Sequence, residues 1–184
     1  MNKDIQEAFN GTRAAGTIAA EALDEVAKII KPGITTNQID SLCYEFINDN
    51  GAYSAPLFYR GFPKSCCTSA NHTICHGIPG DKILTDGDII NVDVTSFKNG
   101  WHGDTSRMFY VGQVSVKAKK LIDVTYNSMM KAIKILNKEI TLGDIGSTIQ
   151  TYVEKEGFSV VRDFCGHGIG KVFHQEPNIL HYGR

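Results

Sequence analysis

Residues 88–111, DIINVDVTSFKNGWHGDTSRMFYV, carry the clearest structural signal in the chain. The first part is rich in β-branched residues in rough alternation with polar ones, which favours a strand. Asn99-Gly100 is the strongest short signal for a β-hairpin, because both central residues of its turn need a positive φ. We therefore expect two antiparallel strands, residues 88–95 and 101–111, joined by a two-residue turn.

This turn also predicts the pairing register of the hairpin. Cross-strand partners then add up to 199, so Asp93 lies opposite Ser106. Asp104 points to the same face as Asp93 and is its diagonal neighbour, with Cα atoms about 7–8 Å apart. Two carboxylates aimed at one point repel each other, and a shared proton or a bound cation relieves the repulsion. If this sheet face were open to solvent, the two carboxylates would need neither a shared proton nor a cation. A one-residue bulge at Gly103 would change the register and separate the two carboxylates.

Four further stretches have apolar residues at helical spacing. Lys31-Pro32-Gly33 would end the first of these helices, and Thr35 with Gln38 forms a capping box at the start of the second. Residues 52–80 look irregular, and the stretch from Val160 onward is expected to begin as a strand before it enters a Gly/His segment. The four expected helices cover about residues 4–30, 36–50, 116–136 and 142–156.

Part of the sequence is repeated after 106 residues. Two amphipathic helices with similar caps could match by chance, and the alternative is a duplicated half-domain. Under the second interpretation a second copy of the hairpin is expected at positions 194–217, past the end of the chain. Five positions of the repeat are identical: Ile34 and Ile140, Thr35 and Thr141, Ile39 and Ile145, Ser41 and Ser147, Gly51 and Gly157.

Composition excludes several classes of protein. The 184 residues are 42% hydrophobic, enough for one domain with a real core. The 19 basic and 20 acidic residues leave a net charge of -1, which argues against general nucleic-acid binding. No apolar run reaches the roughly 18 residues of a membrane span, and the first residues lack the apolar segment of a secretory signal. The five cysteines match no disulfide or zinc-finger spacing, so we expect reduced thiols and a cytoplasmic protein.

The histidines supply further candidate functional groups. His167 lies between glycines, where backbone and ligand can come close. With Asp93 and Asp104 it would make a sound ligand set for a divalent transition metal. His76 and His174 could instead donate a hydrogen bond to a substrate carbonyl or relay a proton, although a single histidine in a glycine-rich loop is more often structural. We interpret the remaining three, His72, His102 and His181, as surface or supporting side chains.

Three segments resemble the type I methionine aminopeptidases: CHGIPG at 75–80, INVDVTSFKNGWHGDTSRMF at 90–109 and CGHGIGKVFHQEPNILHYG at 165–183. The resemblance covers nearly the whole chain. It implies the α+β pita-bread (creatinase/aminopeptidase) fold, in which two pseudo-symmetric αβ halves surround an antiparallel sheet. The chain, residues 1–184, would be a single catalytic domain whose second half is truncated and lacks its C-terminal strands.

The same resemblance implies a role for individual residues. Asp93 would hold one of two divalent metal ions, Asp104 would bridge both, and His167 would bind the other. His76 and His174 would position the scissile amide and stabilise the charge that develops on its carbonyl. An aromatic, sulfur-containing slot suits a thioether. Its lining would consist of Tyr59, Phe62, Cys67 and Phe173, with Phe62 where the family often has Tyr.

The implied activity is hydrolytic removal of the initiator methionine from nascent proteins and peptides, with a preference for a small second residue. The two ions would be Co, Mn, Fe or Zn, because carboxylate-rich ligation suits these metals. The expected partner is a peptide or nascent-chain N-terminus that begins with Met, and the ribosome is a further candidate. We expect a cytoplasmic monomer that binds neither a specific nucleic acid nor a membrane.

The family's two other ligands are glutamates, and one of them takes the proton from the attacking water. They would lie past Arg184, and Glu176 matches a non-ligand position. We therefore expect weak metal binding and little or no turnover from the 184-residue form. Two alternatives stay open: a non-catalytic or inactive truncated module of this fold, and an Xaa-Pro-type peptidase of the same fold. CHGIPG favours the methionine enzyme.

Overall fold

The computed structural model describes residues 3–183, and the contacts between them divide the chain into two units. The first unit comprises residues 3–114 and Ile169–Phe173, and the second comprises Ser115–Gly168 and residues 174–183. Both units combine helices with antiparallel strands, so the expected α+β class is confirmed. None of the helices between residues 3 and 183 has the length and apolar content that a membrane span requires.

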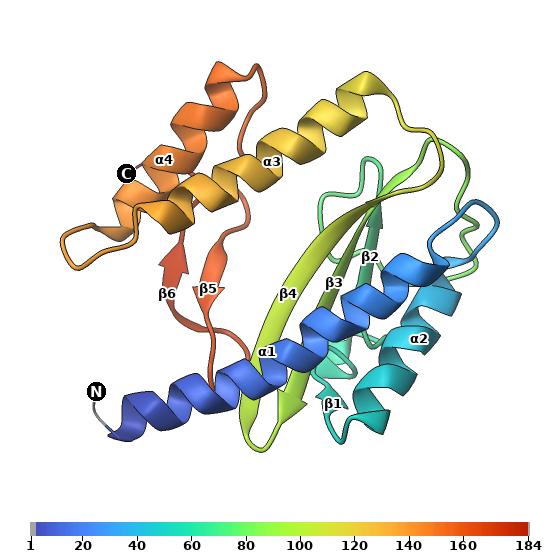
Figure 1. Cartoon of the computed structure of the whole chain (residues 1–184), viewed down its shortest axis with the longest axis horizontal. Coiled ribbons are helices and arrows are strands. Elements are labelled where there is room, and N and C mark those ends of the chain that lie inside the picture. Colours follow the sequence, from blue (N-terminus) through green and yellow to red (C-terminus); the bar gives the residue numbers. More distant parts are fainter. Residues whose placement is uncertain (1–2, 184) are drawn as a thin grey trace. The chain divides into compact units, whose positions relative to one another are not determined.

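The first unit is built on a four-stranded antiparallel sheet with helices packed against it (Figure 1). Its elements are α1 (Lys3–Ile29), α2 (Thr36–Asp49), β1 (Tyr53–Ser54), a 3-10 turn (Tyr59–Gly61), β2 (Cys67–Ala70), β3 (Ile89–Lys98) and β4 (Trp101–Tyr110). β3 is central: β4 pairs along one edge, and β1 and β2 share the other. α1 lies along β3 and β4.

The hairpin forms as the sequence predicts. Asn99 and Gly100 have φ values of 50° and 86°, which gives the two-residue turn. β3 and β4 pair along their whole length in the expected register, with Asp93 opposite Ser106. Because side chains alternate along a strand, the neighbours of Asp93 point to the opposite face, where they are buried in the core.

Gly103 does not form a bulge. It pairs in register with Ser96, at the point where α1 crosses the sheet. A Cβ on Gly103 would lie closer than 3.0 Å to backbone atoms of Ala15 and Gly16. Ser96 Oγ donates a 2.7 Å hydrogen bond to the Ala15 carbonyl at the same crossing. Only glycine therefore lets the helix approach the strand this closely.

The core of the first unit lies between α1, α2 and the sheet. α1 contributes a stripe of small and aliphatic residues at helical spacing, and α2 begins with the predicted capping box of Thr35 and Gln38. α1 packs against β3 and β4, and α2 packs against α1, β1 and β2. The fully buried side chains include Leu23, Val26, Ile39, Cys43, Ile47, Ile90, Val92 and Val94.

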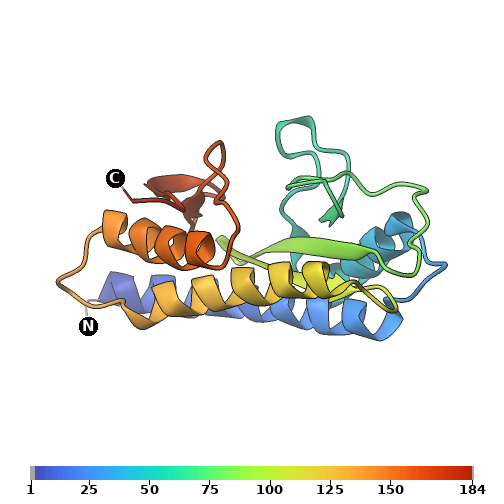
Figure 2. The same ribbon diagram turned by 90° about the horizontal axis from the view of Figure 1, so that it is seen from above.

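The second unit contains two helices that lie side by side (Figure 2) and a short two-stranded sheet. Its elements are α3 (Val116–Lys134), α4 (Leu142–Lys155), β5 (Gly166–Gly168) and β6 (Gln175–Ile179). The capping box of Thr141 and Asp144 at α4 has the same arrangement as the one at α2, and both helices have 14 residues. The helical part of the repeat is thus confirmed, while the hairpin at 194–217 lies outside the described residues.

Two expectations about strands need correction. The stretch from Val160 does not begin as a strand, because β5 starts only at Gly166. A strand needs a partner, and the five residues of β6 pair with Gly166–Gly168 alone. Residues 52–80, expected to be irregular, contain β1 and β2. All four residues of β2 are buried, so it lacks the alternation that would reveal it.

Candidate metal centre

Two carboxylates meet on one face of the β3–β4 hairpin. Asp93 on β3 pairs with Ser106, and Asp104 on β4 pairs with Thr95, so the two aspartates are diagonal neighbours as predicted. Thr95 Oγ1 donates a 2.9 Å hydrogen bond to Asp104 Oδ1. Because Thr95 is only 3% exposed, this bond holds the Asp104 carboxylate in a fixed orientation.

The electrostatics of this pair favour a positive partner. Burial, the charge of Asp104 and a hydrogen bond with Asp104 together raise the pKa of Asp93 to about 7. Two carboxylates this close cannot both ionise freely, so without a cation they hold a proton near neutral pH. A divalent cation would take the place of that proton and neutralise both side chains. Aspartate oxygens are suitable ligands for such a metal, so these residues fit the implied metal centre.

Cys67 lies beside the carboxylates but is not suited to binding metal as a thiolate. It pairs with Asp93 across β2 and β3. Burial raises the pKa of Cys67 to about 12, and the charges of Asp93 and Asp104 contribute. Burial and the charge of Asp93 also raise the pKa of Cys75. Both thiols stay protonated at neutral pH, which suits Cys67 to the wall of an apolar pocket.

His76 is held in a strained backbone conformation. Its φ is 56°, which is uncommon for a residue other than glycine. The next residue, Gly77, packs against β2, where a Cβ would lie closer than 3.0 Å to the Thr68 carbonyl. Gly77 also accepts a 2.8 Å hydrogen bond from Thr68 N–H and donates a 3.1 Å bond to Ser69 Oγ. Strain of this kind concentrates at functional sites, which supports the role expected for His76.

The predicted pocket residues of the first unit include an aromatic pair. The rings of Tyr59 and Phe173 lie 4.9 Å apart between centroids, although the two residues are 114 positions apart in the sequence. Phe62 closes the turn that carries Tyr59, and its N–H donates a 2.9 Å hydrogen bond to the Tyr59 carbonyl. The structure thus brings Tyr59 and Phe173 into contact and places Phe62 on the same turn as Tyr59.

The second unit carries the other two candidate histidines. The rings of His167 on β5 and His174 lie 4.3 Å apart between centroids. His167 Nδ1 lies 2.9 Å from the Gly168 carbonyl, so the tautomer that forms this bond carries its lone pair on Nε2. Such a bond fixes a histidine ring for metal ligation. A Cβ on Gly168 would lie closer than 3.0 Å to the Glu176 carbonyl, which explains why the residue after His167 is a glycine.

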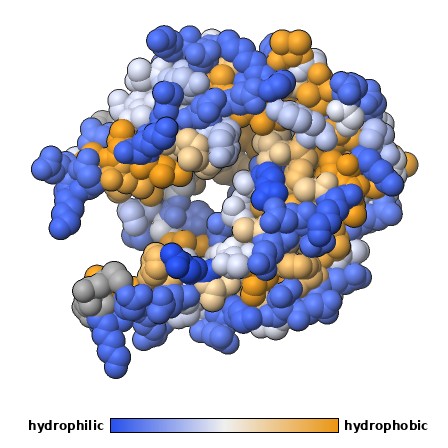
Figure 3. Space-filling model, viewed as in Figure 1, coloured by the Kyte–Doolittle hydropathy of each residue, from blue (hydrophilic) through white to orange (hydrophobic). Residues whose placement is uncertain are grey.

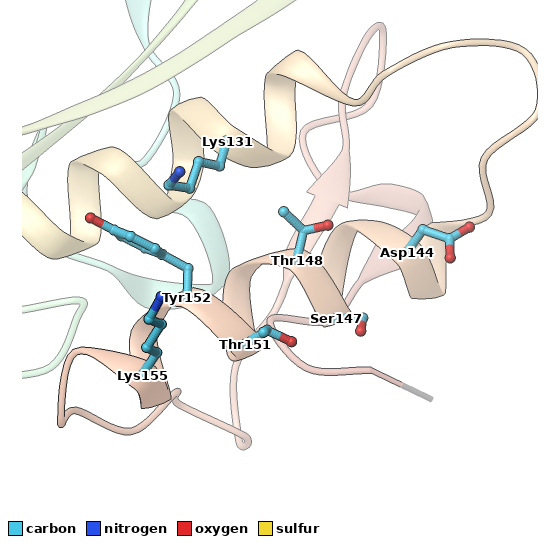
Figure 4. A pocket seen from close by; sticks show the side chains of 7 residues that line it. All are labelled: Lys131, Asp144, Ser147, Thr148, Thr151, Tyr152 and Lys155. Atoms are coloured by element: carbon cyan, nitrogen blue, oxygen red, sulfur yellow. The ribbon is translucent and has the colours of Figure 1, made fainter.

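The second unit also contains a groove between side chains of α3 and α4 (Figure 4). Its volume is about 430 Å³, and no predicted site residue lines it. Among residues 3–183, no three His, Cys, Asp or Glu side chains are arranged to hold a metal ion. The described residues thus bring together only two of the three expected ligands, Asp93 and Asp104. Residues that line the groove are Lys131 on α3 and Asp144, Ser147, Thr148, Thr151, Tyr152 and Lys155 on α4.

One residue beside the site was undervalued by sequence reasoning. His102, interpreted as a surface or supporting side chain, stacks on Phe173 with ring centroids 5.4 Å apart. Alternation along the strand indicates from the sequence that His102 lies on the same face as Asp104. Its contact with Phe173 could not be deduced, because no local pattern connects the two segments.

Comparison with known proteins identifies relatives of the chain. The model of metallopeptidase family M24 matches residues 10–184. The methionine aminopeptidase of Rickettsia prowazekii (strain Madrid E) is 57% identical over 176 residues, which are 96% of this chain and 68% of that protein. The methionine aminopeptidase of Escherichia coli (strain K12) is 50% identical over 172 residues, 92% of this chain and 65% of that protein. The chain thus spans about two thirds of the length of these relatives.

Solved structures show the same fold. The crystal structure of methionine aminopeptidase from Rickettsia prowazekii matches with a TM-score of 0.95 at 56% identity, covering 97% of this chain and 72% of that one. Methionine aminopeptidase from Thermotoga maritima gives a TM-score of 0.95 at 36% identity, with the same coverage. A prolidase from Pyrococcus furiosus, 20% identical with a TM-score of 0.83, covers 96% of this chain and 51% of that one and shares the fold alone. The expected pita-bread fold is confirmed.

Proposed function

Because the chain belongs to the methionine aminopeptidases of metallopeptidase family M24, we propose that it carries most of the site of an enzyme that removes N-terminal methionine. The enzyme is a metal-dependent hydrolase. Its substrates are peptides and nascent chains that begin with Met, preferably followed by a small residue. The observation that carries this proposal is the pair of aspartates on the β3–β4 hairpin, with burial and mutual repulsion raising the pKa of Asp93 to about 7.

We assign the metal ligands from the family resemblance together with the carboxylate pair. Asp93, Asp104 and His167 would hold two divalent ions, and Thr95 keeps the Asp104 carboxylate in its orientation through a 2.9 Å hydrogen bond. When bound, the ions lower the pKa of a water and polarise the scissile carbonyl. Carboxylate and imidazole ligands suit Mn, Fe, Co or Zn.

The remaining residues bind and orient the substrate. His76 and His174 donate hydrogen bonds to the scissile amide and stabilise negative charge on its carbonyl oxygen. The methionine side chain enters an apolar slot lined by the Tyr59–Phe173 pair, Phe62 and Cys67. Cys67 stays a neutral thiol because burial raises its pKa to about 12, so it offers a polarisable wall to the thioether.

We place the enzyme in the cytoplasm as a monomer, with the ribosome as a candidate partner. All five cysteines are free thiols in the structure, which is typical of a reducing compartment. On the face that Figure 3 shows, hydrophilic side chains alternate with apolar areas.

Peptide hydrolysis tests the proposal. The complete protein, loaded with Mn²⁺ or Co²⁺, is incubated with Met-Ala-Ser and with an Xaa-Pro peptide, and the released amino acids are quantified by chromatography. We expect release of methionine from Met-Ala-Ser and no cleavage of the Xaa-Pro peptide. Cleavage of the Xaa-Pro peptide alone would assign the chain to the other peptidase class of this fold. Cleavage of neither peptide would favour a non-catalytic binding module.

A further inference from the structure

The start of β4 holds a distant segment of the chain in place. His102 N–H donates a 2.8 Å hydrogen bond to the Gly170 carbonyl. His102 Nδ1 lies 2.9 Å from the same carbonyl oxygen. A carbonyl oxygen can only accept, so Nδ1 carries the proton and donates the second bond. Two donors from one residue thus anchor the segment Ile169–Phe173 to the hairpin within the first unit.

The His102 ring also supports the predicted pocket directly. It stacks on Phe173 with centroids 5.4 Å apart and planes only 12° from parallel. Phe97, its cross-strand partner, lies 4.7 Å away at a tilt of 47°. Phe173 in turn lies 4.9 Å from Tyr59. The four rings form a continuous row, in which His102 lies between Phe97 and Phe173.

The contacts of Lys171 in this segment are exposed and weaker. Lys171 Nζ lies 4.9 Å from the centroid of the Trp101 ring and 3.5 Å from Glu7 Oε1. The side chains of Lys171 and Glu7 are 65% and 60% exposed, so solvent and salt screen their attraction. His102 is half-buried and makes both hydrogen bonds and a stacking contact, so it anchors the segment more firmly than Lys171 does.

We propose that His102 is a positioning residue that sets the selectivity for methionine by holding Phe173 against Tyr59. This inference rests on the proposed function. An apolar pocket discriminates between aliphatic side chains only as far as its walls stay in place, because one methylene changes the rate by about 10–200-fold. Histidine suits the task because its ring combines a hydrogen-bond donor at Nδ1 with a flat face that stacks on Phe173.

Two substitutions separate these contributions in the complete protein. His102→Asn keeps a donor near the position of Nδ1 but removes the stacked ring, and His102→Phe keeps the ring but removes the donor. For each variant, kcat and KM are measured with Met-Ala-Ser and Leu-Ala-Ser. His72→Ala is the matched control, because His72 is exposed on a loop of the same unit and is assigned no role.

We expect both variants to reduce the preference for Met over Leu by about 10-fold. The loss should come mainly from a higher KM for Met-Ala-Ser, while kcat and Mn²⁺ affinity stay close to wild type. Unchanged selectivity in both variants would overturn the proposal. An equal loss of kcat with both peptides would also overturn it, because that result would indicate a general defect rather than a displaced pocket wall.

Trp101 gives a readout that does not depend on catalysis. It is the chain's one tryptophan and lies against Lys171 of the anchored segment. We expect its emission spectrum to change in His102→Asn, and an unchanged spectrum in both variants would contradict the anchoring. If the wild-type protein released no methionine, the proposed function would fail, while Trp101 emission would still decide whether His102 anchors the segment.

Discussion

Replacing Gly103 with alanine should displace α1 from the sheet. The new Cβ would lie closer than 3.0 Å to backbone atoms of Ala15 and Gly16, whereas carbon atoms in contact keep about 3.5–4 Å. No side-chain rotation can relieve this overlap, because the atoms it meets belong to the backbone of a 27-residue helix. The helix must therefore retreat at the crossing by about an ångström or more.

The cost has two parts. Overpacking of a well-packed contact costs about 1–3 kcal/mol. The retreat also stretches the buried 2.7 Å hydrogen bond from Ser96 Oγ to the Ala15 carbonyl, and leaving such a group unsatisfied costs about 1–3 kcal/mol. We expect Gly103→Ala to lower the free energy of unfolding by about 4 kcal/mol, which corresponds to roughly 8–16 °C in Tm for a chain of this size.

Gly16→Ala is the matched control, since it adds the same methyl group on the helix side of this crossing. A Cβ on Gly16 meets nothing within 4 Å. Alanine is the better helix former, so Gly16→Ala should stabilise the protein by up to about 1 kcal/mol. Both variants are unfolded with urea and followed by circular dichroism. A Gly103→Ala variant within about 0.5 kcal/mol of wild type would refute the reasoning, because that is the spread of neutral surface substitutions.

Two further predictions concern other hydrogen bonds. Thr95→Val in the complete protein should weaken Mn²⁺ binding about 10-fold, the low end for losing a partner that orients a metal ligand. Thr95→Ser keeps a hydroxyl that can bond to Asp104, so this variant should bind Mn²⁺ as wild type does. Equal Mn²⁺ affinities of Thr95→Val and Thr95→Ser in calorimetry would contradict the prediction. Partial burial alone would raise the pKa of Asp88, but hydrogen bonds from Asn71 and Thr85 outweigh it and lower that pKa. Wild type should therefore be more stable than Asp88→Asn above about pH 4, and this advantage should fall as the pH drops through the lowered pKa. The free energies of unfolding are measured by urea titration at several pH values. If the advantage of wild type over Asp88→Asn grew as the pH fell, the prediction would be contradicted.

Features set by neighbouring residues were predictable from the sequence. Asn99-Gly100 selects the hairpin turn, and alternation along two paired strands then places Asp93 and Asp104 on one face. The capping box at Thr35 follows from side chains three residues apart. In each case a short-range hydrogen-bonding or steric rule decides the structure.

Features set by packing between distant segments were not predictable in this way. Gly103 was a candidate bulge, but its actual role depends on a helix about 90 positions earlier in the chain. The importance of His102 depends on a segment that follows it by more than 60 positions. The roles of His167 and His174 rest on the family resemblance, because their sequence spacing from the aspartates carries no geometric information.

The central claim is that the carboxylate pair of the β3–β4 hairpin binds the metal, and calorimetric titration of the complete protein with Mn²⁺ tests it most directly. The account predicts saturable binding by wild type and by the exposed-site control His72→Ala. It predicts that Asp104→Ala abolishes this binding, together with the rise in Tm that Mn²⁺ produces in wild type. Wild-type Mn²⁺ affinity in Asp104→Ala would contradict the account.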